Sequence, residues 1–195
     1  MLIEFTDAEE IRLWTAINDD VMGGISQSRI ELSEAATALF SGQLALENNG
    51  GFASIRRRAD NYNLNVCAGV MLKVKGDGRT YQFRVKTDEQ YDGIAYRTLF
   101  ATDTHQWQTF TLPFARFSAS FRGKPVPGAP VLEAEQIRQI GFLLSDKQSG
   151  SFCLEIAWMK SYYKNGTEFE INNYQDKPPQ IHRLNFLQSV NLWRL

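Results

Sequence analysis

The sequence predicts an all-β fold, a two-sheet jelly-roll β-sandwich with only short helical segments. Three observations carry this prediction: short runs that alternate apolar and polar residues, turn sequences between those runs, and the near absence of a 3.6-residue apolar period. The chain has 195 residues, 43% of them hydrophobic and 22% charged, which suits one packed domain. About ten or eleven strands without a repeat period favour a sandwich over a propeller.

The strand pattern is clearest in three segments, where residues alternate with the two-residue period of a half-buried strand. These segments are 81–85, 106–112 and 152–158. In the last of them, we expect one face to carry Phe152, Leu154, Ile156 and Trp158. Residues that tolerate positive φ form turns between the β-rich runs, at Asn49-Gly50, Gly76-Asp77-Gly78, Asp92-Gly93 and Asn165-Gly166.

Helix is expected only over 7–13, behind a Thr6 or Asp7 cap, and over 133–139. A single domain is expected to cover 1–176. In the remaining tail, 177–195, apolar residues recur with helical spacing. The tail is therefore interpreted as a helix that docks on its own domain, or alternatively as an element that binds a partner or forms a dimer.

Charge and composition exclude several classes of function. With 21 basic and 22 acidic residues the formal net charge is −1, so nucleic acid is not an expected partner. The acidic N-terminus does not resemble a signal peptide, and no apolar run approaches the roughly 20 residues that cross a bilayer. We therefore expect a cytoplasmic protein without membrane insertion. Cys67 and Cys153 lie in strand-like segments without metal-ligand spacing, and both are expected to be buried thiols.

Catalytic motifs are not recognisable, and the chain is not expected to be an enzyme. His105 and His182 have no nearby nucleophile in a known setting, and the glycine-rich segments match neither a dinucleotide fingerprint nor a P-loop. Paired carboxylates stay open as a source of glycosidase chemistry, because loop acids far apart in sequence can converge. The acids concerned are Asp19, Asp20, Asp77 and Asp146.

Two dense stretches, 14–26 and 47–56, carry most of the specific residues. Asn18-Asp19-Asp20 followed by Gly23-Gly24 forms an acidic loop with three readings: a turn whose carboxylates cap backbone N–H groups, a structural cation site for Ca²⁺, or a contact with a ligand or partner. Asn48-Asn49-Gly50-Gly51 is interpreted either as a chain reversal or as a contact loop.

These stretches, together with 75–81, Trp107, 112–114, 121–123 and 140–144, resemble the complex I intermediate-associated protein 30 family from about Trp14 to Trp158. The resemblance implies a galactose-binding-like β-sandwich, similar to carbohydrate-binding modules. It also implies the function of an assembly factor for the respiratory NADH:ubiquinone oxidoreductase.

The leading hypothesis is a non-catalytic protein-binding module, assembly-factor-like or chaperone-like, for a membrane or respiratory redox complex. Its partners would be complex subunits or assembly intermediates, and it needs no cofactor and no metal. The loops 18–26 and 48–56 would form the recognition edge. The candidate binding residues are Asn18, Asp19, Asp20, Met22, Gly23, Gly24, Ser26, Asn49, Gly50, Gly51, Phe52, Arg56, Tyr81, Arg84 and Trp107.

The alternative is a carbohydrate-binding module with an aromatic and arginine-rich concave sheet face. In this reading Tyr81, Arg84, Tyr96 and Trp107 line the face, because sugars stack on aromatic rings and bond to guanidinium groups. If the strands around 52–56 and 81–84 lie in one sheet, the alternation is interpreted as placing two groups of side chains on its opposite faces. One group is Arg56, Tyr81 and Phe83, and the other is Ser54, Gln82 and Arg84. Among the tryptophans, Trp14 and Trp158 are expected in the core, and a core position is also favoured for Trp107.

Overall fold

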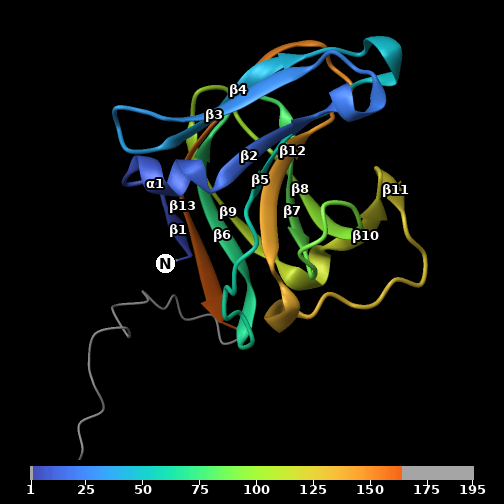
Figure 1. The fold of residues 1–195 in the computed structure, drawn as a ribbon. Coiled ribbons are helices and arrows are strands. Elements are labelled where there is room, and N and C mark those ends of the chain that lie inside the picture. The colour runs from blue at the N-terminus through green and yellow to red at the C-terminus, as the bar shows by residue number, and fades with distance from the viewer. Residues whose placement is uncertain (1, 164–195) are drawn as a thin grey trace, which may run out of the picture.

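Two antiparallel sheets pack face to face in the computed structural model, which describes residues 2–163 (Figure 1). The predicted two-sheet β-sandwich is thereby confirmed. The turns predicted at Asn49-Gly50, Gly76-Asp77-Gly78 and Asp92-Gly93 all lie in connections between strands. The hairpin predicted at Asn165-Gly166 and the tail 177–195 lie outside the described residues.

The first sheet has the order β3-β4-β13-β6-β9, and β1 pairs with β13 at its side. The long strand β13 joins the two halves, since its first part pairs with β4 and its second part with β6. The segments predicted at 106–112 and 152–158 lie in strands of this sheet. Its strands are β1 (Ile3–Glu4), β3 (Gln27–Leu32), β4 (Ala38–Leu44), β6 (Cys67–Lys75), β9 (Trp107–Pro113) and β13 (Gly150–Tyr163).

The second sheet has the order β11-β10-β8-β7-β12-β5-β2. The inner strand β12, between β7 and β5, is buried along its whole length, which fits the continuous apolar character of Ile140 to Leu144. The segment predicted at 81–85 lies in β7. The strands are β2 (Trp14–Asn18), β5 (Ala53–Arg57), β7 (Thr80–Lys86), β8 (Ala95–Ala101), β10 (Ser118–Phe121), β11 (Lys124–Pro125) and β12 (Gln139–Leu144).

Helix is as scarce in the described residues as the sequence predicts. The helix α1 (Ala8–Arg12) begins behind Asp7, whose carboxylate accepts from the N–H groups of Glu9 and Glu10. In the second predicted helix, over 133–139, only one 3₁₀ turn forms, because the backbone is already extended at Ile137. The 3₁₀ turns are η1 (Asp19–Met22), η2 (Glu47–Asn49), η3 (Phe114–Arg116) and η4 (Ala134–Gln136).

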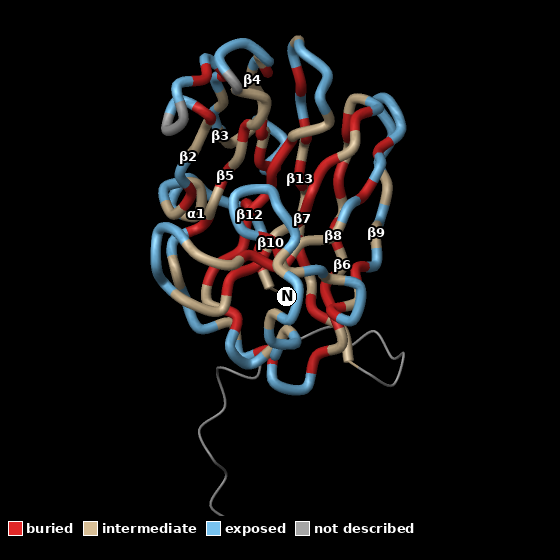
Figure 2. Tube along the Cα trace, turned by 90° about the vertical axis from the view of Figure 1, so that its right-hand side faces the viewer, coloured by how far each residue is buried: buried red, intermediate tan, exposed pale blue. Residues whose placement is uncertain are grey.

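Aromatic rings fill the space between the sheets. Figure 2 shows in red the buried residues along the chain. Phe142 of β12 lies at the centre, with ring centroids 5.3 Å from Phe83, 6.2 Å from Trp14 and 6.2 Å from Phe100. Trp14 is therefore a core residue, as expected. The strand alternation that predicted this core also fixes which side chains point away from it.

A β-bulge in β13 explains why the expectation for Trp158 is wrong. The register against β6 shifts between Ile156 and Trp158, which leaves one extra residue unpaired. Met159 then takes the inner position, where it is fully buried, and Trp158 turns outward under Lys160, whose Nζ lies 4.7 Å from its ring centroid. Trp107 also lies outside the core, 42% exposed on the outer face of the first sheet.

The two cysteines occupy different environments. Cys67 is buried, as expected, whereas Cys153 is exposed. Cys153 alternates with the buried Phe152 and Leu154, so it points away from the core on β13. Within residues 2–163, no helix has the length and apolar character needed to span a bilayer.

The central ring contacts of Phe142 give the first prediction. Phe142→Ala should lower the free energy of unfolding by about 3–5 kcal/mol, because truncating a buried aromatic ring leaves a cavity. Urea denaturation followed by tryptophan fluorescence measures this loss. Phe121→Ala, at a position that is 39% exposed, is the control and should cost far less; equal losses for the two variants would contradict the packing described.

Candidate functional site

The two most specific sequence stretches meet at one buried carboxylate, that of Asp19. Its Oδ1 accepts from the Ser26 N–H at 2.9 Å, and its Oδ2 accepts from the Ser26 hydroxyl at 2.6 Å. Oδ2 also accepts from the N–H groups of Gly51 at 2.6 Å and Phe52 at 3.2 Å. Asp19 therefore ties the end of β2 to the start of β5. We call these four hydrogen bonds the Asp19 lock.

Glycines next to the Asp19 lock are required by space. A Cβ on Gly24 would lie 2.3 Å from the Asp19 Cγ, and a Cβ on Gly50 would lie 2.6 Å from its Oδ2. Gly23 and Gly51 adopt φ values of +88° and +119°, which side chains disfavour. Of the three readings of the acidic loop, the geometry matches the capping turn.

Ionisation of Asp19 is favoured by its hydrogen bonds. Burial opposes the charge, but the Ser26 hydroxyl and the N–H groups of Gly51, Ser26 and Phe52 outweigh it and hold the pKa of Asp19 below its ordinary value. Both carboxylate oxygens are already occupied by these donors. In the part of the chain that the structure describes, no cluster of His, Cys, Asp or Glu could hold a metal ion.

The remaining loop residues only partly form the expected recognition edge. Asp19, Gly24 and Ser26 are buried and do not form part of an exposed edge, so this part of the expectation is corrected. The Asn18 Oδ1 accepts from the Ser28 hydroxyl at 2.5 Å. Asp20 is exposed. The side chains of Met22 and Asn49 lie outside the described part of the structure.

A second candidate site lies on the outer face of the second sheet, the face turned away from the core. The strand register places Arg56 of β5 and Arg84 of β7 on either side of Gly141 in β12, and Arg84 beside Arg97 of β8. We call Arg56, Arg84 and Arg97 the arginine row. Gln82 lies on the same face, two residues before Arg84 on β7.

Two expectations about this face are wrong. Ser54 and Arg56 are two residues apart on one strand, so they share the outer face with Arg84 rather than opposing each other. The aromatic residues of the carbohydrate reading are elsewhere. Tyr81 is fully buried, with its hydroxyl on Asp77, and the Tyr96 hydroxyl donates to the Pro130 carbonyl at 3.0 Å. Trp107 belongs to the other sheet.

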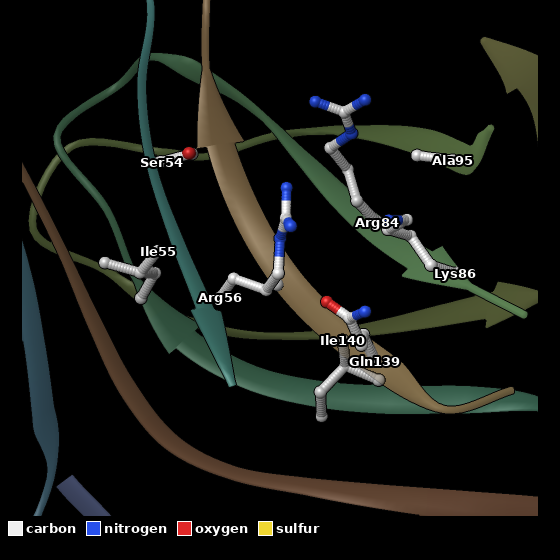
Figure 3. A pocket seen from close by; sticks show the side chains of 9 residues that line it. Ser54, Ile55, Arg56, Arg84, Lys86, Ala95, Gln139 and Ile140 are labelled. Carbon is white, nitrogen blue, oxygen red and sulfur yellow. The ribbon is translucent and has the colours of Figure 1, made fainter. Parts of the chain in front are cut away.

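A small pocket of about 30 Å³ opens on this face. Gly141 forms its floor, since the absence of a side chain leaves room between Arg56 and Arg84, which rise on the same side of the sheet (Figure 3). A Cβ on Gly141 would lie 2.4 Å from the carbonyl oxygen of Ile55, so only glycine fits there. The lining residues are Ser54, Ile55, Arg56, Arg84, Lys86, Ala95, Gln139, Ile140 and Gly141.

The cations around the pocket differ in their partners. Arg56 donates to the Tyr91 carbonyl at 2.7 Å and lies over the Tyr91 ring, 5.5 Å from its centroid. The Lys86 Nζ lies 3.1 Å from the Asp88 carboxylate. The Arg84 Nε is buried without a hydrogen-bond partner, the one such side-chain atom in the described part of the chain.

Electrostatics set Arg84 apart as well. Burial, followed by the positive charges of Arg56 and Arg97, lowers the pKa of Arg84 to about 10. Burial also lowers the pKa of Arg56, although Tyr91, Asp88 and Asp92 oppose that effect. The arginine row is therefore a group of like charges that an anion would stabilise.

Sequence reasoning named Arg56 and Arg84 but missed Arg97, Lys86 and Gln139. The sequence does contain a signal for Arg97, which follows Tyr96 in a strand-like run. Because Tyr96 faces the core, the alternation of the strand places Arg97 on the outer face. Lys86 and Gln139 stand at the ends of their strands, so only the register of β7 with β12 brings them to the pocket.

The chain is similar to proteins of one known family over most of its length. Residues 3–156 match the family model described as Complex I intermediate-associated protein 30. A mitochondrial protein of that name from Drosophila melanogaster is 26% identical, over 90% of this chain and 67% of its own length. The protein of that name from Mus musculus is 28% identical, over 93% of this chain and 61% of its own length. The matched part of the chain thus corresponds to about two thirds or less of the length of these relatives.

Among solved structures, a family 11 carbohydrate-binding module from Clostridium thermocellum has a TM-score of 0.60 and 16% identity, covering 83% of this chain and 94% of its own. The same type of module in complex with a β-1,3-1,4-mixed-linked tetrasaccharide has a TM-score of 0.57 and 16% identity, covering 77% of this chain and 89% of its own. At this identity the likeness concerns the fold alone.

The Asp19 lock predicts a large stability loss on its removal. Asp19→Asn should lower the free energy of unfolding by about 2–3 kcal/mol, because an amide cannot accept from all four donors and hydrogen bonds to a charged group are strong. Urea denaturation at neutral pH measures the loss. The matched control is Asp20→Asn at the exposed neighbour, and a control variant as unstable as Asp19→Asn would refute the lock.

The lowered pKa of Asp19 predicts a pH dependence of stability. Its folded-state pKa lies below the ordinary value of 3.8, so the ionised form stabilises the protein above that pH. This contribution is lost as the pH falls through the folded-state pKa. The free-energy difference between wild type and Asp19→Asn should therefore shrink with acidification below about pH 4. Denaturation curves measured across that range test this, and a constant difference would argue against it.

Proposed function

The chain belongs to the complex I intermediate-associated protein 30 family, and from this premise we propose that it is a non-catalytic protein-binding module with an assembly-factor function. Its partners are subunits or assembly intermediates of a membrane or respiratory redox complex. The names of the curated relatives support this partner class. The outer face of the second sheet is the contact surface.

The observation that carries the proposal is the arginine row. Arg97 and Arg84 have no carboxylate partner within residues 2–163, and exposed apolar side chains lie close by. Leu99 stands two residues after Arg97 on β8 and is 59% exposed, and Tyr91 is 64% exposed. Arginine and aromatic residues are the types enriched where proteins bind each other. This combination suits a protein surface that carries acids among apolar residues.

The loops of the Asp19 lock adjoin the end of β2 and the start of β5, two strands of the sheet that carries this surface. Gly51 and Phe52 are held by Asp19 immediately before β5 begins at Ala53. Because β5 carries Arg56, the lock fixes where that guanidinium stands relative to β12. The buried residues of these loops therefore act in positioning the contact surface, and exposed members such as Asp20 and Gly23 are left for direct contact.

The chemistry of the thiols fits a non-catalytic module. Burial raises the pKa of the Cys67 thiol. Cys153 is exposed as a residue, but partial desolvation of its thiol, followed by the nearby acids Asp77 and Glu155, raises its pKa. A raised pKa keeps a thiol protonated at neutral pH, and the protonated form is a weak nucleophile.

A carbohydrate ligand is the weaker candidate. The fold likeness to carbohydrate-binding modules at 16% identity supports no ligand assignment. The face that would bind sugars lacks the aromatic side chains that this hypothesis placed there, because Tyr81 and Tyr96 point into the core. A surface with guanidinium groups in place of ring faces favours anions over neutral sugars.

The proposal predicts which partners are captured and which substitutions release them. Tagged protein crosslinked in extracts of its own source should enrich respiratory-complex subunits, detected by mass spectrometry. Arg84→Gln combined with Arg97→Gln should lower that recovery by about tenfold or more, since central arginines carry much of an interface's energy.

Arg29→Gln is the matched control, because Arg29 is an exposed arginine on the first sheet. Its recovery should equal that of wild type. Recovery of other proteins without respiratory-complex subunits, or equal recovery by the double variant, would count against the proposal.

A further inference from the structure

We propose that Arg84 anchors a site that binds one side-chain carboxylate, Asp or Glu, of the partner protein. The inference rests on the proposed function and adds the chemistry of recognition to it. The site consists of the pocket over Gly141 together with the arginine row around it.

Arg84, a half-buried residue with a buried Nε, differs from the buried cations Arg57, Arg79 and Lys86. Arg57 lies 2.8 Å from Glu10 and 2.9 Å from Asp60, Arg79 lies 2.6 Å from Asp146, and Lys86 lies 3.1 Å from Asp88. Each of them has an acid of its own chain. Arg84 has none among the described residues, and its buried Nε donates to nothing. A charge taken out of water is costly unless an opposite charge accompanies it.

Its neighbours increase that cost. Arg56 and Arg97 place two further positive charges on the same face, and both disfavour the charged form of Arg84. Removing the charge of Arg84 would relieve this repulsion. A fold that retains it carries a local penalty that an external anion would offset, which is the usual pattern at binding sites.

The other polar groups of the pocket are already committed. The Ser54 hydroxyl donates to the Ile17 carbonyl at 2.6 Å, and the Gln139 amide donates to the carbonyls of Asp88 and Gln90. The Lys86 ammonium is held by Asp88 and Gln90. Arg56 donates to the Tyr91 carbonyl through one nitrogen, whereas the Arg84 guanidinium has no hydrogen bond within the described residues and is therefore the main donor open to a ligand in the pocket.

The shape and charge of the site favour a carboxylate over a phosphate. A planar carboxylate matches the two-pronged face of a single guanidinium. A phosphate dianion would also feel the acids of the neighbouring loop, since Asp88 and Asp92 act on Arg56 in the same face. The pocket of about 30 Å³ is small, which suits a compact group.

The source of the carboxylate is a protein segment. Exposed Leu99 and Tyr91 flank the cations and would contact apolar residues on either side of the acid. The net charge of −1 generates no long-range field that would gather a polyanion such as a nucleic acid. A glutamate or aspartate with apolar neighbours is therefore the expected epitope.

The test uses the full chain and three probes at constant ionic strength. They are the peptide N-acetyl-Leu-Glu-Leu-amide, its Gln counterpart and inorganic phosphate, with binding followed by isothermal titration calorimetry or NMR. The Glu peptide should bind saturably, and the Gln peptide about tenfold more weakly or less, since it lacks the charge. Arg84→Gln should abolish the preference for Glu, Arg84→Lys should restore it in part, and Arg29→Gln should leave it unchanged.

A stability measurement keeps the test independent of folding defects. Unliganded Arg84→Gln should melt at or above the temperature of wild type, because it removes an unpaired charge. A markedly lower melting temperature would show that Arg84 holds the fold, and would overturn the proposal. Phosphate binding without Glu-peptide binding would overturn the carboxylate assignment, and no binding of either probe would overturn the site.

These outcomes separate the inference from the proposed function. If the Glu peptide fails to bind while wild type still captures respiratory-complex subunits, the carboxylate site falls and the protein-binding function stands. If the Glu peptide binds through Arg84 while no such subunits are captured, the site stands and the assembly-factor function falls.

Discussion

The buried carboxylate of Asp19 is the interaction on which the candidate surface depends. One negative charge without exposure to solvent accepts from four donors, and these donors come from two loops that are far apart in sequence. Such a group is stable only when every lone pair is used. That requirement explains the glycines at 24 and 50, since a Cβ at either position would collide with the carboxylate. Loop residues that look like a binding motif are thereby accounted for as internal structure.

Buried charge is handled in two opposite ways in this molecule. Asp19, Arg57 and Arg79 are compensated within the chain, by backbone N–H groups or by carboxylates, so they fix the fold. Arg84 is surrounded by like charges and is left with a free buried donor. Compensated charges have nothing left to offer a partner, whereas an uncompensated one gains from any anion that arrives. Burial and pairing together, rather than exposure alone, thus distinguish structural residues from candidate binding residues.

Strand alternation was sufficient to predict the two-sheet fold and core residues such as Trp14, because a period of two needs only local sequence. It failed at Trp158, where one extra residue in a β-bulge exchanges the inward-facing and outward-facing positions of the strand. The sequence of apolar and polar residues gives no sign of this bulge. The arginine row was beyond reach for another reason. Arg56, Arg84 and Arg97 belong to three strands, and only the pairing of β5, β12, β7 and β8 aligns them. Similarly, the readings of Asp19 were separated only by counting donors from a distant loop.

The side chains on the outer face of the second sheet are not determined by the fold that this chain shares with carbohydrate-binding modules. The likeness to carbohydrate-binding modules extends over most of the chain, yet side chains that alternate out of the sheet can change without disturbing the core beneath them. Here the inward positions keep aromatic residues such as Tyr81 and Phe83, while the outward positions carry guanidinium groups around a glycine floor. Ring faces recognise the flat apolar sides of sugars, and guanidinium groups recognise oxyanions. The fold shared with carbohydrate-binding modules therefore does not decide the chemistry of this face, where guanidinium groups suit oxyanions better than neutral sugars.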